Sequence, residues 1–310
     1  MNVLILGAAG FLGKRCVAQF QAKNYEVMTS DNHGLVDFIG DLSSEDFAMT
    51  LPDADVIVNC AAVQYVSTDI PLIFRNDYFY KNNVLTAKNL YERYRNANSR
   101  FVHVGTSMMY RQDGSQIYSI QSAMSGDGVY SQSKMQAQFF INQLPNVATV
   151  IPCIIGGEGR EGLFNNFVKM IKKKNSVIFP GKGNHQISMV HVDDVASLIM
   201  LLAEKSVGGF YNAAAPDPLS ISNWIDEITA ELEIGSGKVR KISLPLAPIQ
   251  LLSAIFGYRL LAKEQLLMLK MPHVLSIKES LELGWRPAFT NANIVRDIAR
   301  HINLRYLQGK

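Results

Sequence analysis

The chain opens with the stretch Asn2-Val3-Leu4-Ile5-Leu6-Gly7-Ala8-Ala9-Gly10-Phe11-Leu12-Gly13. After Asn2, the four residues Val3 to Leu6 are apolar without interruption, and the stretch 2–6 is typical of a short strand buried on both faces of a parallel sheet. Residues 14–23 follow directly with helical periodicity. A strand, a glycine-rich turn and a helix in this order form the context that a dinucleotide-binding fingerprint requires, because the glycines permit a tight turn and the helix N-terminus receives the pyrophosphate. The cofactor-binding residues expected here are Gly7, Gly10, Phe11, Leu12 and Gly13.

Short apolar segments then alternate with helical ones through the first half of the chain. Further strands are expected at residues 25–29, 37–42, 55–62, 101–107 and 148–155, and a long helix at about 72–96. Such regular alternation predicts the α/β class, with a doubly wound parallel Rossmann sheet and right-handed crossovers. Ligands of such sheets bind beyond the carboxyl ends of the strands. Residues at these expected ends are Gly7, Asp31, Ala61 and Thr106.

The choice of dinucleotide depends on the end of the second strand. Asp31 lies about 20 positions after the glycines, where a carboxylate accepts hydrogen bonds from the adenosine ribose and repels a 2′-phosphate. Asn32 follows, and no arginine stands beside the pair, so NAD is favoured over NADP. Four more cofactor contacts are expected at strand ends: Asp41 and Leu42 near the adenine, and the small residues Ala61 and Ala62, which let a flat cofactor lie close.

Composition and charge exclude several classes of function. The 310 residues are 48% hydrophobic and 18% charged, as in an ordinary globular protein that can hold two subdomains. A formal net charge of +3 is too small for a nucleic-acid surface, and the lysine run 172–174 is interpreted as the solvated end of a helix. Cys16, Cys60 and Cys153 lack metal-ligand spacing, so we expect no metal site and three free thiols in a reducing compartment.

The ends of the chain and its longest apolar stretch bear on location. No secretion signal is visible at the N-terminus, and the apolar stretch 244–261 is interrupted by prolines and an arginine. We therefore expect a cytoplasmic protein without a membrane span.

Tyr130 and Lys134 lie four positions apart in a helical segment, so they share one face of a helix. A free tyrosine hydroxyl titrates near pH ~10. A nearby ammonium favours the phenolate, and lowering the tyrosine pKa by about 3 units takes roughly 4 kcal/mol. The pair can therefore act as a general acid/base on a hydroxyl or a carbonyl, although a tyrosine and a lysine at this spacing more often decorate a solvated helix.

Six motifs follow one another along almost the whole chain. They are Gly7-Ala8-Ala9-Gly10-Phe11-Leu12-Gly13, Asn59-Cys60-Ala61-Ala62, Thr106-Ser107-Met108-Met109-Tyr110, Tyr130 with Lys134, Val190-His191-Val192-Asp193-Asp194-Val195-Ala196, and Leu283-Gly284-Trp285-Arg286-Pro287. In this order they resemble the motifs of the extended short-chain dehydrogenase/reductase superfamily, the NAD-dependent epimerase/dehydratase family. Its members include nucleotide-sugar epimerases and dehydratases and the hydroxysteroid dehydrogenases.

The resemblance implies a catalytic set. Tyr130 is the expected general acid/base, and Lys134 is expected to lower its pKa and to hold the nicotinamide ribose. The family's hydroxyl partner stands four residues before a tyrosine, which selects Thr106 ahead of Ser107 for the hydrogen bond to the reacting oxygen. These residues move a proton while hydride passes between the substrate and the cofactor.

Other matching residues are expected to support the site. Asn83, in the long helix, is expected to support the active site, and Pro152 to contact the cofactor. His191 is interpreted as a structural histidine that returns the chain to the sheet. Asp193 and Asp194 are interpreted as caps of the following helix.

Two departures from the family pattern concern the substrate. Nucleotide-sugar members carry an asparagine near the position of Cys153, and an arginine for the substrate pyrophosphate where this chain has Ile187. The resemblance therefore favours the hydroxysteroid dehydrogenase-like branch: an NAD-dependent oxidoreductase that interconverts an alcohol and a ketone on a substrate other than a nucleotide sugar. Arg160, Lys182 or His185 could replace the missing arginine, so a nucleotide-sugar epimerase or dehydratase stays an alternative. A second alternative is a non-catalytic cofactor-sensing protein.

Domain boundaries and partners complete the expectations. The dinucleotide-binding domain is expected at 1–156, with 187–203 returning to it. The smaller α/β substrate-binding subdomain is expected at 157–186 and 204–310. The resemblance implies a small-molecule substrate and a homodimer, and for the apolar segment 244–269 it leaves open a lid, a dimer contact or weak contact with a membrane surface.

Overall fold

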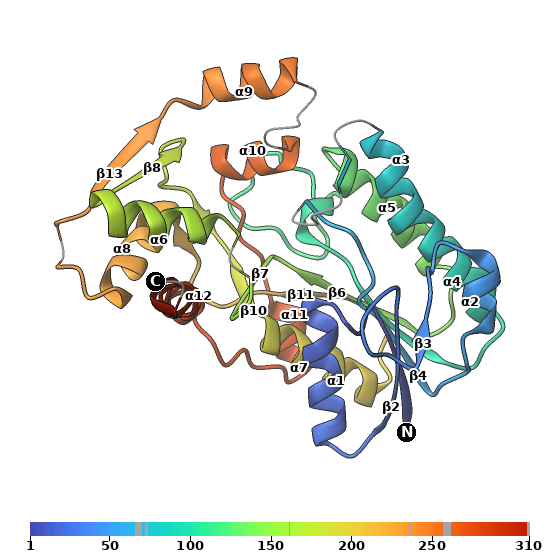
Figure 1. The fold of residues 1–310 in the computed structure, drawn as a ribbon. Helices are drawn as coiled ribbons and strands as arrows, with labels where there is room; N and C mark the ends of the chain where they lie inside the picture. The colour runs from blue at the N-terminus through green and yellow to red at the C-terminus, as the bar shows by residue number, and fades with distance from the viewer. Residues whose placement is uncertain (66–69, 72–73, 161, 236, 257–261, 309–310) are drawn as a thin grey trace.

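The central element is a parallel sheet of seven strands (Figure 1). The computed structural model describes residues 1–65, 70–71, 74–160, 162–235, 237–256 and 262–308. The strands follow the order β11-β6-β5-β4-β1-β2-β3. Their bounds are β1 Asn2–Leu6, β2 Glu26–Asp31, β3 Phe38–Ile39, β4 Val56–Asn59, β5 Arg100–Val104, β6 Val147–Pro152 and β11 Gly209–Ala213. The predicted doubly wound Rossmann fold is confirmed.

The first strand lies where the winding of the sheet reverses. β1 pairs with β2 on one side and with β4 on the other, so the chain crosses over β1 after β3. Crossovers that leave in opposite directions open a crevice at the carboxyl ends of the two strands. This crevice begins at Gly7, the residue that follows β1.

Alternate side chains of β1 enter two separate cores. Val3 and Ile5 pack with α1 (Phe11–Ala22) and α7 (Val192–Lys205), which contact each other. Leu4 and Leu6 pack on the opposite face of the sheet, in a second core that also contains Leu90 and Ile141 from two helices. A period of two places successive strand side chains on opposite faces. The uninterrupted apolar run therefore reflects a sheet covered on both sides.

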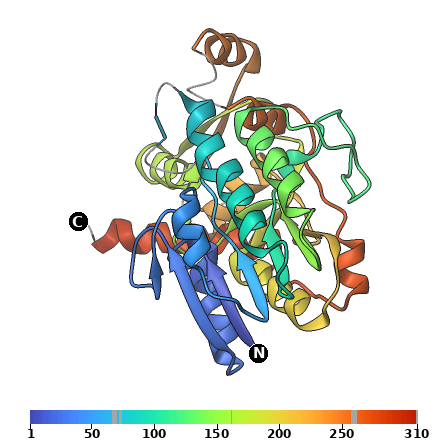
Figure 2. The same ribbon diagram turned by 90° about the vertical axis from the view of Figure 1, so that its right-hand side faces the viewer.

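The second face is covered by a row of helices that includes the Tyr130 helix. They are α2 Glu45–Thr50, α3 Arg75–Phe79, the π-helix η1 Tyr80–Leu85, α4 Thr86–Tyr94 and α5 Val129–Ile141. Figure 2 shows α4 and α5 side by side. The single long helix expected at 72–96 is thus three consecutive segments from residue 75; residues 72 and 73 lie outside the described residues.

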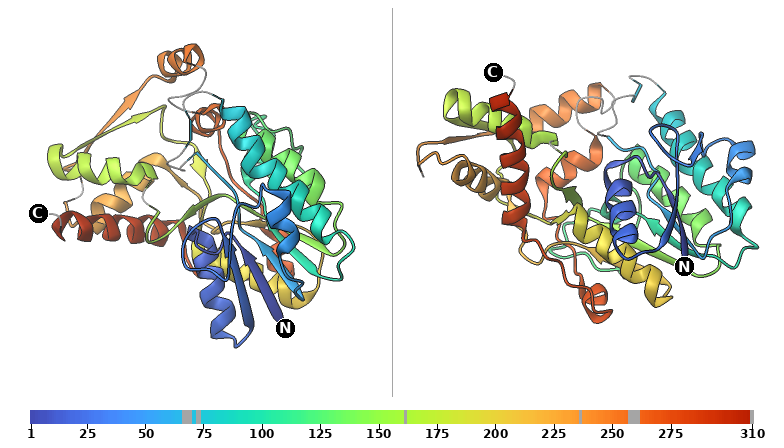
Figure 3. Two further views of the ribbon diagram at one scale, coloured as in Figure 1. Left: turned by 45° about the vertical axis from the view of Figure 1, so that its right-hand side comes forward. Right: turned by 60° about the horizontal axis from the view of Figure 1, so that its bottom comes forward.

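The rest of the chain forms a smaller lobe with its own hydrophobic core. Its helix α12 (Asn291–Gln308) lies alongside α6 (Gly162–Lys174) and α8 (Ile221–Glu231), as Figure 3 shows. The remaining elements are η2 Ser107–Met109, β7 Ile154–Gly156, β8 Ser176–Pro180, β9 Gln186–Ile187, β10 Met189–His191, β12 Leu219–Ser220, β13 Arg240–Leu244, α9 Leu246–Ile255, α10 Lys263–Lys270 and α11 Lys278–Glu282.

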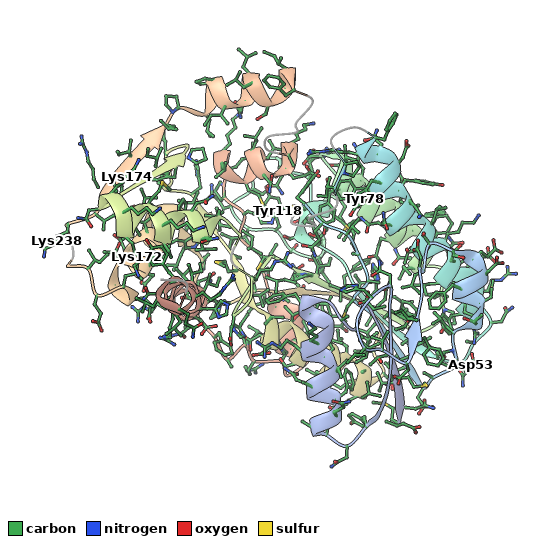
Figure 4. The ribbon with its side chains drawn as sticks, in the orientation of Figure 1. Asp53, Tyr78, Tyr118, Lys172, Lys174 and Lys238 are labelled. Atoms are coloured by element: carbon green, nitrogen blue, oxygen red, sulfur yellow. The ribbon has the colours of Figure 1, made fainter. Side chains whose placement is uncertain are left out.

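Helix ends in this lobe follow the sequence signals. The lysine run closes α6, where Lys173 and Lys174 are exposed, and Figure 4 shows Lys172 and Lys174 on the outer side of the lobe. The Ser220 hydroxyl accepts a hydrogen bond from Asn223 N at 3.2 Å, so Ser220 caps α8. The cap of α7 differs from expectation: His191 accepts from Asp193 N, whereas Asp194 accepts from the backbone of Ala288 and Phe289.

The expected substrate-binding subdomain, residues 204–310, includes a strand that the structure places in the main sheet. β11 is hydrogen-bonded in parallel to β6 as the edge strand of the main sheet, because five residues from Gly209 register with five from Ala148. Leu275 and Trp285 also pack in the core that contains Val3 and Ile5. The dinucleotide-binding domain therefore includes residues 209–213, and the chain returns to it again near residues 275–285.

Candidate functional site

A cleft of about 380 Å³ opens at the carboxyl ends of β1, β2 and β4. Eight of the residues predicted to bind the cofactor line it: Gly7, Gly10, Asp31, Asn32, Asp41, Leu42, Ala61 and Ala62. It is also lined by residues that the sequence did not single out, among them Asn82 and Thr86 from the helices beside it. A larger hollow of about 550 Å³ around Asn2, Asp55 and Ser99 lies at the opposite, amino ends of the strands, where such sheets do not bind cofactors.

The glycine turn leaves no room for side chains. Gly7 has φ +74°, and a Cβ there would lie 2.7 Å from Ala61 N. A Cβ on Gly13 would lie 2.0 Å from the Gly7 carbonyl oxygen, so the first turn of α1 lies directly against the loop. Leu12 lies in the core and Phe11 packs against it. A backbone cradle at a helix N-terminus fits a pyrophosphate.

Asp31 is held in place by the same loop. Its Oδ2 accepts a hydrogen bond from Ala9 N at 2.9 Å, and its Oδ1 accepts from Asn32 N at 2.7 Å. The side chain of Asp31 is buried, while its neighbours Asn32 and His33 are exposed. Oδ1 also lies 3.1 Å from His33 Nδ1, so Oδ2, which can accept a second hydrogen bond, keeps capacity for a ribose hydroxyl. This arrangement fits an adenosine ribose without a 2′-phosphate.

The Tyr130 phenol lies buried at the start of α5 and is hydrogen-bonded to the side chain of Thr106, which lies two residues after β5 and directly before η2. Burial raises the pKa of Tyr130 to about 12, and hydrogen bonding with the Thr106 side chain and the charge of Arg160 oppose this increase. The hydroxyl that interacts with Tyr130 is that of Thr106, and its predicted hydrogen bond to a substrate oxygen stays a prediction. Ser107 is instead hydrogen-bonded to His273 Nε2 at 2.7 Å. Two hydroxyls thus meet where a substrate oxygen could bind.

Lys134 lies one turn further along α5. It is 2% exposed, its Nζ donates to the Val104 carbonyl at 2.9 Å, and burial lowers its pKa to about 8. The cation that lowers the pKa of Tyr130 in this structure is Arg160. The predicted effect of Lys134 on Tyr130, and its contact with a ribose, stay predictions.

Arg160 follows β7 and reaches the same place from the other lobe. Its Nη2 donates to Gln64 Oε1 at 2.6 Å, and its guanidinium carbon lies 5.4 Å from the centroid of the Phe11 ring. Burial lowers the pKa of Arg160. A guanidinium beside Tyr130 can bind an anionic substrate group in bidentate fashion.

The Asn83 side chain is hydrogen-bonded to two other parts of the protein. It lies in the π-helix η1, a kind of distortion that is frequent at functional sites. Its Oδ1 accepts from Val63 N at 3.0 Å, and its Nδ2 donates to Ser133 Oγ at 2.9 Å. Asn83 therefore ties the loop after β4 to α5, and its expected supporting role in the active site stays a prediction. Pro152, the end of β6, is buried beside Ala213.

The two positions that argued against a nucleotide sugar are both buried. Ile187 is 2% exposed and lies in the core of the smaller lobe. The Cys153 thiol donates to the Ala213 carbonyl at 3.3 Å, and burial raises its pKa. Cys16 and Cys60 are also free, with their sulfurs 3.9 Å apart.

One acidic residue near the site was missed by the sequence reasoning. Glu264 in α10 is 2% exposed and lies against the N-terminus of α5. It is the only acidic residue between Glu233 and Glu279, in the stretch interpreted as apolar. A lone carboxylate in such a stretch is the signal that could have found it, because burying one requires hydrogen-bond partners.

The apolar segment 244–269 contains a helix that stands out from the body of the protein (Figure 1). In α9, Leu251 and Ile255 are 63% and 66% exposed, and only Ser253 is buried. The lid, dimer contact and membrane contact proposed for this segment stay predictions. Within the described residues, no helix combines the length and apolar character needed to cross a membrane, and no group of acidic, histidine or cysteine side chains is suited to a metal ion.

Comparisons with known proteins agree with this geometry. Residues 3–214 match the model of the NAD dependent epimerase/dehydratase family. The chain is 24% identical to the UDP-glucose 4-epimerase of Vibrio cholerae over 318 residues, which cover 93% of this chain and 92% of that protein. It is also 24% identical to the N-acetyl-alpha-D-glucosaminyl-diphospho-ditrans,octacis-undecaprenol 4-epimerase of Escherichia coli O157:H7, over 79% of this chain and 75% of that protein.

Solved structures share the whole fold at low identity. The UDP-glucuronic acid 4-epimerase from Bacillus cereus in complex with NAD superposes with a TM-score of 0.73 and 16% identity, over 99% of this chain and 100% of that one. The Bordetella bronchiseptica enzyme WbmG in complex with NAD gives 0.77 and 16%, over 98% and 94%. These comparisons do not support the hydroxysteroid dehydrogenase-like branch in particular. The match over residues 3–214, together with the glycine cradle, Asp31 and the Tyr130 site, places this chain in the NAD-dependent epimerase/dehydratase family of enzymes, with NAD as its cofactor.

Proposed function

We propose that the protein is an NAD-dependent epimerase or dehydratase that acts on a sugar linked to a diphosphate. The observation that carries the proposal is that the Tyr130 phenol interacts with both the Thr106 side chain and the charge of Arg160. The Vibrio cholerae and Escherichia coli relatives are, by name, epimerases of diphosphate-linked sugars, which favours the nucleotide-sugar epimerase or dehydratase alternative. The same names weigh against the expected substrate other than a nucleotide sugar.

The reaction needs a proton to move between a substrate hydroxyl and the protein. NAD, when bound, supplies reversible hydride acceptance from the carbon that bears this hydroxyl. The ionised Tyr130 phenol removes the hydroxyl proton and later returns it, and Thr106 donates a hydrogen bond to the same oxygen. Lys134, with its pKa lowered to about 8, can stay protonated near neutral pH and favour the phenolate.

Arg160 is the proposed partner of the substrate diphosphate. It lies close enough to Tyr130 for their charges to interact, and it comes from the smaller lobe, on the substrate side. The core position of Ile187 explains why no cation is needed there: a side chain packed among apolar neighbours does not reach a ligand. A bidentate guanidinium would supply the affinity that the family's usual arginine provides.

A second candidate is an alcohol/ketone oxidoreductase with an apolar substrate. The exposed apolar side chains of α9 favour it, since such a face could cover a hydrophobic molecule. A non-catalytic sensor has no support among the described residues, because it would need neither Thr106 nor Tyr130 nor Lys134.

A ligand screen tests the choice of substrate. The NAD-loaded protein is heated with UDP- and dTDP-sugars, with sterols and with keto acids, and the thermal midpoint is followed. A nucleotide sugar that raises the midpoint is then incubated with enzyme, and its stereochemistry is read by proton NMR. Stabilisation by sterols or keto acids alone would refute the sugar assignment and select the second candidate.

We also propose that the protein is a homodimer built on the outer faces of the helices beside Tyr130. Phe139 in α5 and Tyr80 in η1 support this, as they are 66% and 49% exposed. Light scattering after size exclusion would give the mass of a dimer, and Phe139→Glu should shift it to a monomer. A wild-type protein that elutes as a monomer at every concentration tested would contradict the proposal. The expected cytoplasmic location stays a prediction.

A further inference from the structure

Glu264 crosses from the C-terminal segment to the helix that carries Tyr130. Its Oε1 accepts hydrogen bonds from Ser131 N at 3.0 Å and from Ser131 Oγ at 2.8 Å. Its Oε2 accepts from the Tyr65 hydroxyl at 2.9 Å. Glu264 is 2% exposed, so its carboxylate is buried. These three hydrogen bonds come from the first turn of α5 and from Tyr65 beside it.

The backbone of α5 is shaped to receive this carboxylate. A Cβ on Gly128, the residue before α5, would lie 2.0 Å from Glu264 Oε2, so the approach requires glycine at that position. The first N–H groups of a helix have no partners inside the helix, and a negative charge there is favourable. Glu264 therefore supplies to the first turn of α5 what a local capping side chain usually supplies.

Tyr65 extends the contact to Tyr130 itself. Its hydroxyl, which donates to Glu264, accepts a hydrogen bond from Tyr130 N at 3.2 Å. The two rings meet edge to face, with centroids 5.4 Å apart. Both the backbone and the ring of Tyr130 are thus held by groups that Glu264 fixes.

The same C-terminal stretch holds the other side of the site. His273, nine residues after Glu264, is fully buried, and its Nε2 lies 2.7 Å from Ser107 Oγ. Ser107 directly follows Thr106. The segment 264–273 therefore fixes the two elements that supply the hydroxyls of Tyr130 and Thr106.

We propose that Glu264 is a positioning residue for Tyr130, and that the C-terminal segment that bears it completes a proton-transfer site built by the N-terminal domain. A side chain that served only to cap α5 could come from the residue directly before the helix, as the Ser220 hydroxyl does for α8. In α5 the capping carboxylate belongs to Glu264, 133 residues after Ser131, and it also binds Tyr65, whose ring packs against Tyr130. The proposal rests on the proposed function only in that Tyr130 is taken as the acid/base.

The test uses Glu264→Gln in the full-length protein with NAD. The amide keeps the size of the side chain but turns one acceptor oxygen into a donor, so one of its two hydrogen-bonding sides is lost. Hydrogen exchange of the backbone amides of Tyr130 and Ser131 should become faster, and turnover should fall roughly 10- to 100-fold, as expected for a misplaced catalytic group. NAD affinity should change less than about twofold, since the glycine cradle and Asp31 are untouched.

A pH profile separates positioning from simple loss of structure. The charge of Glu264 raises the pKa of Tyr130, while Arg160 and Thr106 lower it and the neutral Tyr65 hydroxyl lies between them. Removing the charge should therefore move the acid limb of turnover to lower pH. Glu264→Asp, which keeps the charge, should leave the acid limb at its wild-type position. Tyr65→Phe should speed up hydrogen exchange at Tyr130 and Ser131 but move the acid limb less than Glu264→Gln does.

The control is Glu282→Gln in α11, a carboxylate that is exposed and paired only with Lys278 at 3.8 Å among the described ion pairs. It should leave exchange and turnover unchanged. Unchanged exchange at Tyr130 and Ser131 in Glu264→Gln, or a fall in turnover with no shift of the acid limb, would overturn the proposal. Full turnover by Tyr130→Phe would overturn the proposed function instead, and the exchange rates of Glu264→Gln would still report on the hold over α5.

Discussion

Lys134 should cost the folded protein stability at neutral pH. Burial lowers its pKa from the ordinary 10.5 to about 8. A difference of about 2.5 pKa units corresponds to about 3 kcal/mol against the charged form in the folded state, since one unit is about 1.4 kcal/mol. This penalty is fully present below pH ~8, declines as the pH rises, and is gone above pH ~10.5, because only the unfolded chain binds the proton in that window.

Replacing the lysine with an apolar side chain of similar length should therefore stabilise the protein while stopping turnover. Lys134→Met removes the buried charge and also the hydrogen bond to Val104, which contributes about 1 kcal/mol. The expected net gain at pH 7 is about 2 kcal/mol, and it should shrink or reverse at pH 10. Urea unfolding of both proteins at the two pH values, followed by circular dichroism, measures this difference.

Lys88→Met is the matched control, because Lys88 is exposed on α4. Its unfolding free energy should stay within about 0.5 kcal/mol of wild type at both pH values. A Lys134→Met protein that is less stable than wild type at pH 7, or a stability difference that does not change with pH, would refute the reasoning. Such a result would mean that Lys134 is already neutral or well solvated in the folded protein.

Three further substitutions test the cofactor and proton-transfer sites. Tyr130→Phe should lower turnover by about 10²- to 10⁴-fold with NAD affinity unchanged, as measured by isothermal titration; nearly normal turnover would remove Tyr130 from the mechanism. Gly13→Ala should abolish measurable NAD binding in the same titration, because its Cβ would lie 2.0 Å from the Gly7 carbonyl oxygen, and wild-type affinity would show that the loop can move aside. Asp31→Asn should weaken NAD binding and narrow the preference for NAD over NADP, because the amide no longer repels a 2′-phosphate; an unchanged ratio of the two dissociation constants would exclude that role.

The sequence by itself predicted a doubly wound parallel sheet, although not its edge strand β11, and it predicted eight of the residues that line the cleft at the strand ends. A short apolar run such as residues 3–6, followed directly by a glycine, favours a strand buried on both faces, and the glycine at position 7 permits the backbone geometry that follows. These requirements are local, so the pattern of neighbouring residues expresses them. The positions of Asp31 and Ala61 followed in turn, because parallel strands end at one common edge.

Only the tertiary structure decided which distant side chains complete the catalytic end. Arg160 and Glu264 approach Tyr130 from distant parts of the chain; the sequence marks each as a notable charged residue, but it does not show that they meet at Tyr130. β11 joins the main sheet for the same reason: its place depends on the free edge of β6. Burial then sets the pKa values of Tyr130 and Lys134, which the spacing of the two residues left open, because desolvation depends on everything packed around a group and not on its neighbours in the chain.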